Sequence, residues 1–460
     1  MSFSELRSEM WALSLFGGRL AAAELILFSV FLTDIVMLGY IGELSLSAAL
    51  LANSTFVLFY VTALGFLQGA LPLATRHLER RDRVAYSGVI VLSILQAALI
   101  GLVIVVTFFC YPLILRALGY PEDMIAESWA YIAWILPGYG LSMIYIALRN
   151  AVIATSSSHG FITLSLVALV LNAIFNYLLG FGFSVGGFTF TGMGISGIGL
   201  ASSIIEVVLF TGFVALLQKS GFRLSDLGAS GWQRIKAALQ QLRESLVIGL
   251  PIGVVFFVNS TLFSGVLIMV GRHDIQGMAA LALIFECAAL LLMMPLGLSE
   301  AIVQRVSLFD ALDQAARQRQ IEIITQASIC VTSAYILLLA VIYFVAGINI
   351  PVLLLFDKSS HHELIVTLDG FMILGFLVAA LHTFVIIMAS ILRGLLDVNI
   401  SMFVSLTCYW GVGLGLTFIL VEIAGLGARF GLISVVTALA VSVVSITWRL
   451  WLLKSQPQST

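Results

Sequence analysis

The sequence predicts an all-α integral membrane protein with twelve transmembrane helices in two pseudo-symmetric six-helix bundles. Of its 460 residues, 61% are hydrophobic and 10% are charged, whereas soluble domains are about 45–50% apolar and about 25% charged. The apolar residues form continuous runs, and a transmembrane β-barrel would show alternation instead. The formal net charge of −2 gives no basic surface for nucleic acid. We therefore exclude a soluble enzyme and a nucleic-acid-binding protein.

Twelve apolar segments are separated by charged or turn-rich breaks, and a helix needs about 20 such residues to cross a bilayer. The segments are residues 17–40, 47–75, 86–114, 125–153, 160–182, 192–218, 245–271, 277–306, 321–347, 364–395, 399–422 and 428–453. The first contains Arg19, Glu24 and Asp34, which a signal-peptide core would lack, so it is interpreted as a membrane helix as well.

Most arginine and lysine residues fall on one side of the predicted membrane. If the N-terminus is cytoplasmic, the basic residues of loops such as 76–83 and 219–243 are cytoplasmic too, and only a few, such as Arg116 and Arg272, fall outside. This distribution follows the positive-inside rule. It predicts a multi-pass protein with both termini in the cytoplasm.

The longest polar interruption divides the chain near its middle. It predicts an N-lobe at 1–218, a cytoplasmic inter-lobe linker at 219–244 and a C-lobe at 245–460. Within the linker, WQRIKAALQQL at 232–242 can form a short amphipathic helix on the membrane surface.

The two lobes resemble each other in sequence. MLGYIGELSLSAAL at 37–50 aligns without gaps with 269–282, and IALRN at 146–150 aligns with SILRG at 390–394. Because equivalent segments run in the same direction, the halves should be parallel repeats about an axis along the membrane normal. Such duplicated halves are a transporter architecture, with the substrate path between them.

A few ionisable residues lie inside the apolar segments, where a charge costs about 2.5–3.5 kcal/mol to insert. They are Glu24, Asp34, Glu206, Glu286 and His382. Glu300, Arg149 and Arg393 lie nearer segment ends and are interpreted as interfacial, since long arginine side chains can reach the surface. The interior is therefore mainly acidic, which suits protons or cations.

Polar residues at helical spacing accompany Asp34. Asn172 and Asn176 are four residues apart, as are Ser202 and Glu206, so each pair lies on one helical face. Amides and a hydroxyl facing a carboxylate are the arrangement that a proton relay needs. The alternative is that the asparagines only join neighbouring helices.

Glu24 and the cysteines leave other interpretations open. Glu24 lies about 80° around the helix from Asp34, so it either shares a cavity with Asp34 or anchors the interface near Arg19.

The cysteines are scattered without metal-ligand spacing and are interpreted as packing residues, so we expect no metal and no cofactor. They are Cys110, Cys287, Cys330 and Cys408.

This succession of motifs resembles the multidrug and toxic compound extrusion (MATE) family over nearly the whole chain. LTDIVMLGYIGELSLSAAL is similar to the family's helix 1 acid and the loop after it, and VLNAIFNYLLGFG is similar to its helix 5 asparagine motif. GLPIGVVFFVNSTLF, LLLMMPLGLSEAIVQRV and ILRGLLDV resemble its helices 7, 8 and 10.

The resemblance implies a monomeric antiporter of the bacterial inner membrane that exports amphipathic, mostly cationic, drug-like compounds by alternating access. In the family, the N-lobe site uses the helix 1 acid and the helix 5 asparagine, which correspond to Asp34 and Asn172. A second helix 5 position, often aspartate, is Asn176 here, the helix 6 hydroxyl is Ser202, and Tyr139 falls near the site.

The C-lobe departs from the sodium-coupled branch of that family. The helix 7 glutamate and helix 10 aspartate of that branch correspond to Asn259 and His382, so we expect proton coupling, as in the DinF-like branch. A single buried carboxylate among amides also favours a proton over a sodium ion. Glu286 either contacts cationic substrates or forms a buried pair with His382.

Other functions remain open from the sequence. A sodium-coupled exporter of the same family is one, and a lipid-linked oligosaccharide flippase of the same superfamily is another. The flippase's anionic cargo would require arginine or lysine deep in the path, where none is visible. A membrane-embedded enzyme would require a catalytic constellation at membrane depth, and none occurs.

Overall fold

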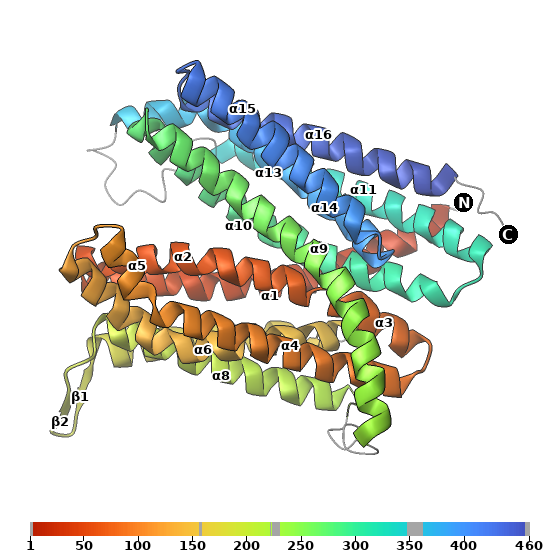
Figure 1. The fold of residues 1–460 in the computed structure, drawn as a ribbon, viewed down its shortest axis with the longest axis horizontal. Coiled ribbons are helices and arrows are strands. Elements are labelled where there is room, and N and C mark those ends of the chain that lie inside the picture. The colour runs from red at the N-terminus through yellow and green to blue at the C-terminus, as the bar shows by residue number, and fades with distance from the viewer. Residues whose placement is uncertain (1–2, 156–158, 221, 223–230, 347–361, 456–460) are drawn as a thin grey trace. The chain divides into compact units, whose positions relative to one another are not determined.

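The computed structural model describes residues 3–155, 159–220, 222, 231–346 and 362–455 (Figure 1). Within these residues, twelve helices are long and apolar enough to cross a membrane. All twelve coincide with the apolar segments of the sequence. The protein is therefore an all-α, multi-pass integral membrane protein, as predicted.

The first half of the chain is helical except for one short hairpin. Its elements are α1 (Phe3–Ile41), α2 (Glu43–Leu67), α3 (Ala70–Glu79), α4 (Arg83–Phe109), α5 (Tyr111–Ala117), α6 (Glu122–Ala154), α7 (His159–Phe175), the π-helical segment η1 (Asn176–Phe181), β1 (Phe183–Val185), β2 (Phe188–Phe190) and α8 (Ile195–Lys219).

The second half is helical throughout its described residues. Its elements are α9 (Gly231–Gly271), α10 (Ile275–Leu308), η3 (Phe309–Ala311), α11 (Gln314–Ala346), α13 (His362–Gly394), α14 (Val398–Ser405), η4 (Leu406–Leu414), α15 (Gly415–Thr417), η5 (Phe418–Ile423) and α16 (Ala428–Ser455). The segments η4 and η5 are π-helical.

Contacts divide the chain into two compact units. Unit 2 is Ala22–Gly253, and unit 1 joins Met1–Ala21 to Val254–Thr460. Each of α1 and α9 therefore contributes residues to both units. The lobes expected from the sequence were successive stretches of chain, and their boundaries stay a prediction.

In unit 2, α6 packs against α8, α4 and α2. Glycines allow α6 and α8 to approach closely: a Cβ atom on Gly138 would lie 2.6 Å from the Ser203 Cα, and one on Gly199 would lie 2.6 Å from the Tyr131 carbonyl oxygen. Small residues have this role in membrane helix pairs, because van der Waals packing drives their association. The close contact fixes α8 beside the helix that carries Tyr139.

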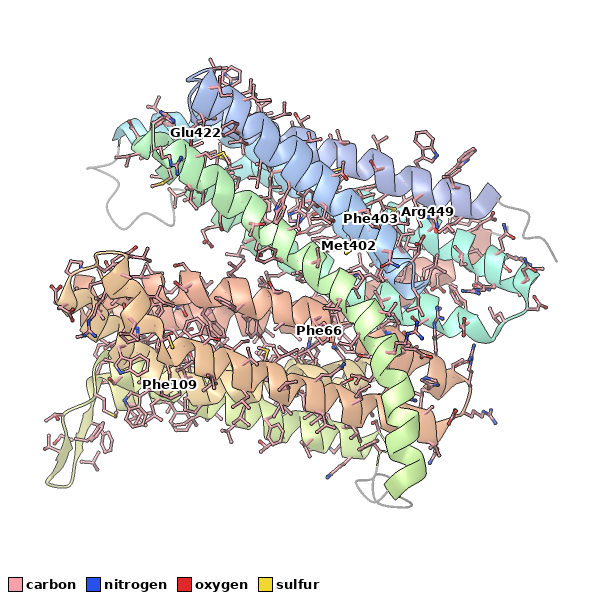
Figure 2. All side chains as sticks on the ribbon, viewed as in Figure 1. Phe66, Phe109, Met402, Phe403, Glu422 and Arg449 are labelled. Carbon is pink, nitrogen blue, oxygen red and sulfur yellow. The ribbon has the colours of Figure 1, made fainter. Side chains whose placement is uncertain are left out.

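In unit 1, α10 packs against α13, and α13 packs against α16. The core contains fully buried residues such as Val258, Leu262 and Leu439. Outward-facing side chains are also apolar, for example Phe403, which is 60% exposed (Figure 2). In unit 2, Phe109 is exposed in the same way. Exposed aromatic side chains on membrane-spanning helices are what contact with lipid would require.

Two local features differ from the sequence interpretation. Residues 232–242 do not form a separate surface helix, because α9 runs without interruption from Gly231 to Gly271. Residues 243–248, which join this stretch to the predicted membrane segment, contain neither glycine nor proline, so the helix continues. The hairpin β1–β2 was missed: Phe183 pairs with Phe190, and Gly186 and Gly187 form its turn with φ of 57° and 88°. A Gly-Gly turn between short apolar runs was the available signal.

Candidate functional site

Asp34 is buried in unit 2 and accepts hydrogen bonds from three side chains. Asn172 Nδ2 and Asn176 Nδ2 donate to Asp34 Oδ1 at 2.9 and 2.6 Å. Ser202 Oγ donates to Asp34 Oδ2 at 2.8 Å. The structure therefore brings Asp34 together with three of the residues that the sequence grouped with it, Asn172, Asn176 and Ser202, and we call these four residues the Asp34 cage.

Local helix geometry aims both amides at one oxygen. Asn172 lies in the last turn of α7, and Asn176 begins the π-helical segment η1. A π-helical turn changes the angular spacing of side chains and is often found at functional sites. Asn176 Nδ2 also donates to Asn172 Oδ1 at 3.2 Å, which fixes the two amides relative to each other.

The cage contains one carboxylate and only neutral donors. No ion pair found among the described residues involves Asp34. The Ser202 hydroxyl has a second acceptor, the Ile198 carbonyl oxygen at 3.1 Å. A single hydroxyl hydrogen can serve either acceptor, so Ser202 can donate to an ionised Asp34 or accept from a protonated one.

Tyr139 lies near the cage but is not part of it. Its hydroxyl donates to Asn53 Oδ1 at 3.2 Å, and its ring stacks on Phe56 with a centroid distance of 3.5 Å. Sequence reasoning missed Asn53, a buried amide in α2. An asparagine inside the second apolar segment was the signal that could have identified it.

Ser203 connects α8 to the α6 backbone beside Pro137, a proline inside that helix. Ser203 Oγ accepts from the Gly138 backbone N–H at 3.0 Å and donates to the Trp134 carbonyl oxygen at 2.5 Å. Those two backbone groups are four residues apart and would bond to each other in a regular helix. The hydroxyl therefore bridges the α6 backbone beside the proline, one residue after Ser202.

Glu24 does not share the cage. It accepts a hydrogen bond from the Arg149 guanidinium, forming an ion pair within unit 2. Arg149 is only 4% exposed and lies over the Phe161 ring at 5.3 Å. Arg149 is therefore buried against Glu24 and does not reach the protein surface, so its interpretation as a surface-reaching side chain is wrong.

Glu206 lies on α8, one turn after Ser202. Its Oε2 atom is buried and has no hydrogen-bond partner within the described part of the chain. It interacts electrostatically with Asp34. The sequence placed Glu206 on the Ser202 face of the sixth helix, and the structure agrees.

In unit 1, Asn259 and His382 contact each other. Asn259 Nδ2 lies 3.1 Å from His382 Nε2, and the imidazole stacks on the Phe263 ring at 5.6 Å. Glu286 is exposed on α10 and forms no ion pair with His382 among the described residues. The buried Glu286–His382 pair that the sequence left open is therefore not formed.

Arg393 and Glu300 are also buried in unit 1, at 9% and 4% exposure. They interact electrostatically, and Arg393 donates to Ser299 Oγ at 3.2 Å. Arg393 therefore does not extend to the protein surface, contrary to the sequence interpretation. Packing between α10 and α13 buries both side chains, and sequence position along one helix does not show this.

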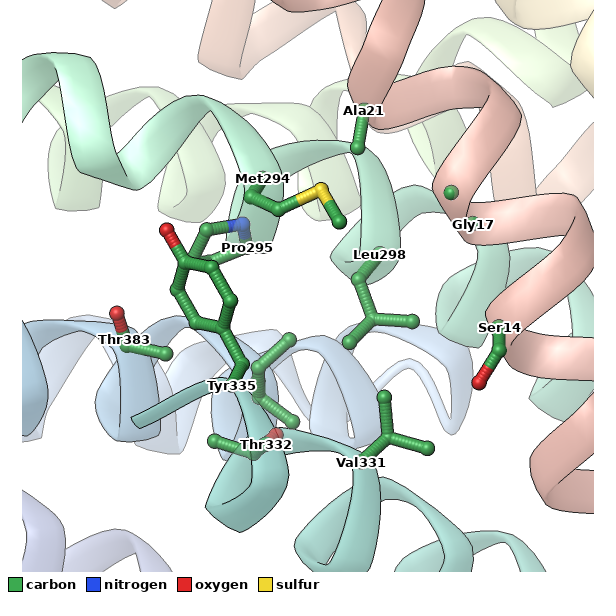
Figure 3. Close-up of a pocket in the computed structure, with 12 residues that line it drawn as sticks. Ser14, Gly17, Ala21, Met294, Pro295, Leu298, Val331, Thr332, Tyr335 and Thr383 are labelled. Atoms are coloured by element: carbon green, nitrogen blue, oxygen red, sulfur yellow. The ribbon is translucent and has the colours of Figure 1, made fainter. Parts of the chain in front are cut away.

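A cavity of about 100 Å³ lies within unit 1 between α1, α10, α11 and α13 (Figure 3). Thr332, Tyr335, Thr383 and Met294 contribute to its wall. Its lining contains no acid, so it offers no negative charge to a cation. Among the described residues, no group of three or more His, Cys, Asp or Glu side chains is placed to hold a metal ion.

Comparison with known proteins identifies relatives over most of the chain. The MatE family model matches residues 20–178. The probable multidrug resistance protein NorM of Mesorhizobium japonicum is 26% identical over 405 residues, covering 84% of this chain and 82% of that protein. The NorM protein of Agrobacterium fabrum is 25% identical over 449 residues, covering 96% and 94%.

Solved structures share the fold. The eukaryotic MATE transporter AtDTX14 superposes with a TM-score of 0.85 at 17% identity, covering 97% of this chain and 96% of that one. An outward-facing multidrug resistance MATE transporter of the MOP superfamily superposes with a TM-score of 0.81 at 18% identity, covering 99% and 100%. The MatE match over residues 20–178, the NorM relatives and the twelve membrane helices together support a transporter of the MATE family.

Proposed function

We propose that this protein is a secondary active multidrug exporter that carries amphipathic, mostly cationic organic compounds in exchange for protons by alternating access. The relatives named NorM carry the description of multidrug resistance, which supports this substrate class. The coupling ion is inferred from the Asp34 cage, and that cage is the observation on which the proposal depends.

An isolated carboxylate at membrane depth requires neutralisation, because a buried charge without a counter-charge is costly. The described neighbours of Asp34 are two amides and a hydroxyl, which donate hydrogen bonds but supply no positive charge. Either a proton or a cation must complete the site. Competition between the two would exchange substrate for a proton.

Ser202 gives the cage a means to stabilise both states of Asp34. In the ionised state its hydroxyl donates to Asp34 Oδ2. In the protonated state the Asp34 hydroxyl would donate to Ser202 Oγ, and the Ser202 hydrogen would turn to the Ile198 carbonyl oxygen, 3.1 Å away. A proton can therefore be gained or lost without leaving Asp34 Oδ2 or Ser202 Oγ unpartnered, which would cost about 1–3 kcal/mol.

The charge distribution favours cationic over anionic cargo. The buried arginines are engaged by acids: Arg149 pairs with Glu24, and Arg393 interacts with Glu300. A flippase for anionic lipid-linked sugars would need such arginines free to bind its cargo. Sodium coupling is disfavoured because a hard cation is usually held by oxygen ligands that carry more than one negative charge, and the cage supplies a single carboxylate.

The test is ethidium efflux from everted membrane vesicles that receive either a proton pulse or a sodium pulse. We expect the proton pulse alone to drive efflux and the Asp34→Asn variant to lose it, because an amide of the same size cannot exchange a proton. Drive by sodium alone, or full efflux by the variant at matched protein level, would contradict the proposal.

A further inference from the structure

The hairpin formed by β1 and β2 has one apolar face and one polar face. Phe183 pairs with Phe190, and Ser184 pairs with Thr189. Because side chains alternate between the two faces of a strand, Phe183, Val185 and Phe190 share one face. Ser184 and Thr189 share the other. The Phe183 and Phe190 rings lie 5.9 Å apart by centroid distance, and the two hydroxyl oxygens of the polar face lie 3.1 Å apart.

The apolar face of this hairpin is exposed. Val185 is 70% exposed and Phe183 is 37% exposed. Figure 1 shows the hairpin extending sideways from the ends of the unit 2 helices. A two-stranded hairpin by itself is at best marginally stable in water, so we expect a further surface to cover its apolar side chains.

The surroundings of the hairpin point to lipid as that surface. The hairpin joins η1, which ends at Phe181, to α8, which begins at Ile195, and both belong to helices that are long and apolar enough to cross a membrane. It therefore lies within a few residues of the membrane boundary. Tyr177, just before it, is 58% exposed, and tyrosine is enriched at that boundary. Residues 160–205 contain no charged side chain, so contact with lipid removes no charge from water.

We propose that the β1–β2 hairpin lies in the membrane interface, with the face of Phe183, Val185 and Phe190 in lipid, and anchors the end of η1 and the start of α8 there. The unpaired backbone groups along the outer edges of the hairpin must keep hydrogen-bond partners, which the hydrocarbon layer cannot supply. The headgroup layer supplies them, and the face of Ser184 and Thr189 stays hydrated. An interfacial position therefore satisfies both faces.

The base of the hairpin is joined tightly to the helices on either side. The Met193 backbone N–H donates to the Leu179 carbonyl oxygen at 2.7 Å, which ties the chain just before α8 to η1. Asn176 begins η1 and Ser202 lies on α8, and both donate to the carboxylate of the Asp34 cage. An anchored hairpin would therefore hold the two segments that carry these donors. This role goes beyond the proposed transport function and does not depend on it.

Spin labelling of the full-length protein in liposomes of phosphatidylethanolamine and phosphatidylglycerol tests the placement. The label is attached to Val185→Cys or to Ser184→Cys in a variant whose four native cysteines are alanine. These neighbouring positions face opposite sides of the hairpin, so each is the control for the other. We expect the label at position 185 to collide mainly with lipid-soluble oxygen, at a depth of about 5–10 Å, and the label at position 184 to collide mainly with a water-soluble nickel chelate.

Two results would overturn the placement. Nickel collisions at position 185 that equal or exceed those at position 184 would show that the apolar face lies in water. Few collisions with either reagent at position 185 would show that protein covers this face instead of lipid.

Amide hydrogen exchange of the protein with its native cysteines, in the same liposomes, tests the anchor. Val185→Asp and Ser184→Asp each add one charge, but only the first adds it to the apolar face. We expect Val185→Asp to raise exchange of residues 176–182 several-fold, because a charge drives that face out of lipid, and Ser184→Asp to leave exchange unchanged. Unchanged exchange in Val185→Asp, or an equal rise in both variants, would refute the anchor. Neither experiment uses a gradient or a substrate, so failure of the proposed proton coupling would leave both results unaffected.

Discussion

Ser202→Ala tests whether the hydroxyl beside Asp34 supports proton exchange. The substitution removes the donor to Asp34 Oδ2 at 2.8 Å and also the acceptor for a protonated Asp34. A hydrogen bond to a charged group contributes about 1.5–3 kcal/mol and one between neutral groups about 0.5–1.5 kcal/mol. The ionised form should therefore lose about 1–1.5 kcal/mol more than the neutral form. The pH profile of efflux should therefore move by about one pH unit toward higher pH.

The assay is the pH dependence of ethidium efflux in everted vesicles at matched protein level. Ser202→Thr keeps a hydroxyl and should stay close to the wild type. Thr211→Val is the control on the same helix, because the Thr211 hydroxyl bonds only to backbone oxygens of α8 and is exposed. An unchanged pH profile in Ser202→Ala, or the same shift in Thr211→Val, would refute a role for Ser202 in proton exchange.

Three further substitutions probe the Asp34 cage, the α6 backbone and Glu286. Asn176→Ala removes the shortest bond to Asp34, 2.6 Å, and should alter the pH dependence of efflux while keeping partial transport; an unaltered profile argues against the cage. Ser203→Ala leaves two α6 backbone groups without their bridge and should destabilise the protein by about 1–3 kcal/mol in thermal unfolding, whereas Ser142→Ala, whose hydroxyl bonds only within α6, should not. Glu286→Gln should weaken dye binding less than Asp34→Asn, because water screens an exposed acid; an equal or larger loss contradicts this ranking.

The membrane helices and the Asp34 cage could be predicted because their signals are local. A run of about 20 apolar residues identifies a membrane helix without knowledge of its neighbours, and a spacing of four residues places Asn172 and Asn176 on one face. The contact of these residues with Asp34 depends on the packing of three helices. Few other polar residues lie inside the apolar segments, however, so Asp34 had few candidate hydrogen-bond partners.

The arginine pairs could not be predicted in the same way. Arg149 and Arg393 each lie near the end of an apolar segment, where a long side chain could equally reach water or turn inward. Only the packing of neighbouring helices shows that Glu24 and Glu300 lie within reach. The Ser203 bridge was missed for the same reason, because it joins the α6 backbone beside Pro137 to a helix more than 60 residues later.

The two halves share aligned sequence motifs and differ in the hydrogen-bond partners of their buried acids. The aligned motifs at 146–150 and 390–394 place Arg149 and Arg393 at equivalent positions, and each is buried with an acid in its own unit. Both halves also contain π-helical segments, η1 in one and η4 in the other. At η1 two asparagines bind Asp34, whereas the buried residues of η4 include Cys408 and Tyr409. Protonating the acid of a buried ion pair leaves the other charge without its partner, which is energetically costly. Proton exchange is therefore expected at an acid whose partners are neutral. We therefore expect proton coupling to be carried by the half that contains Asp34.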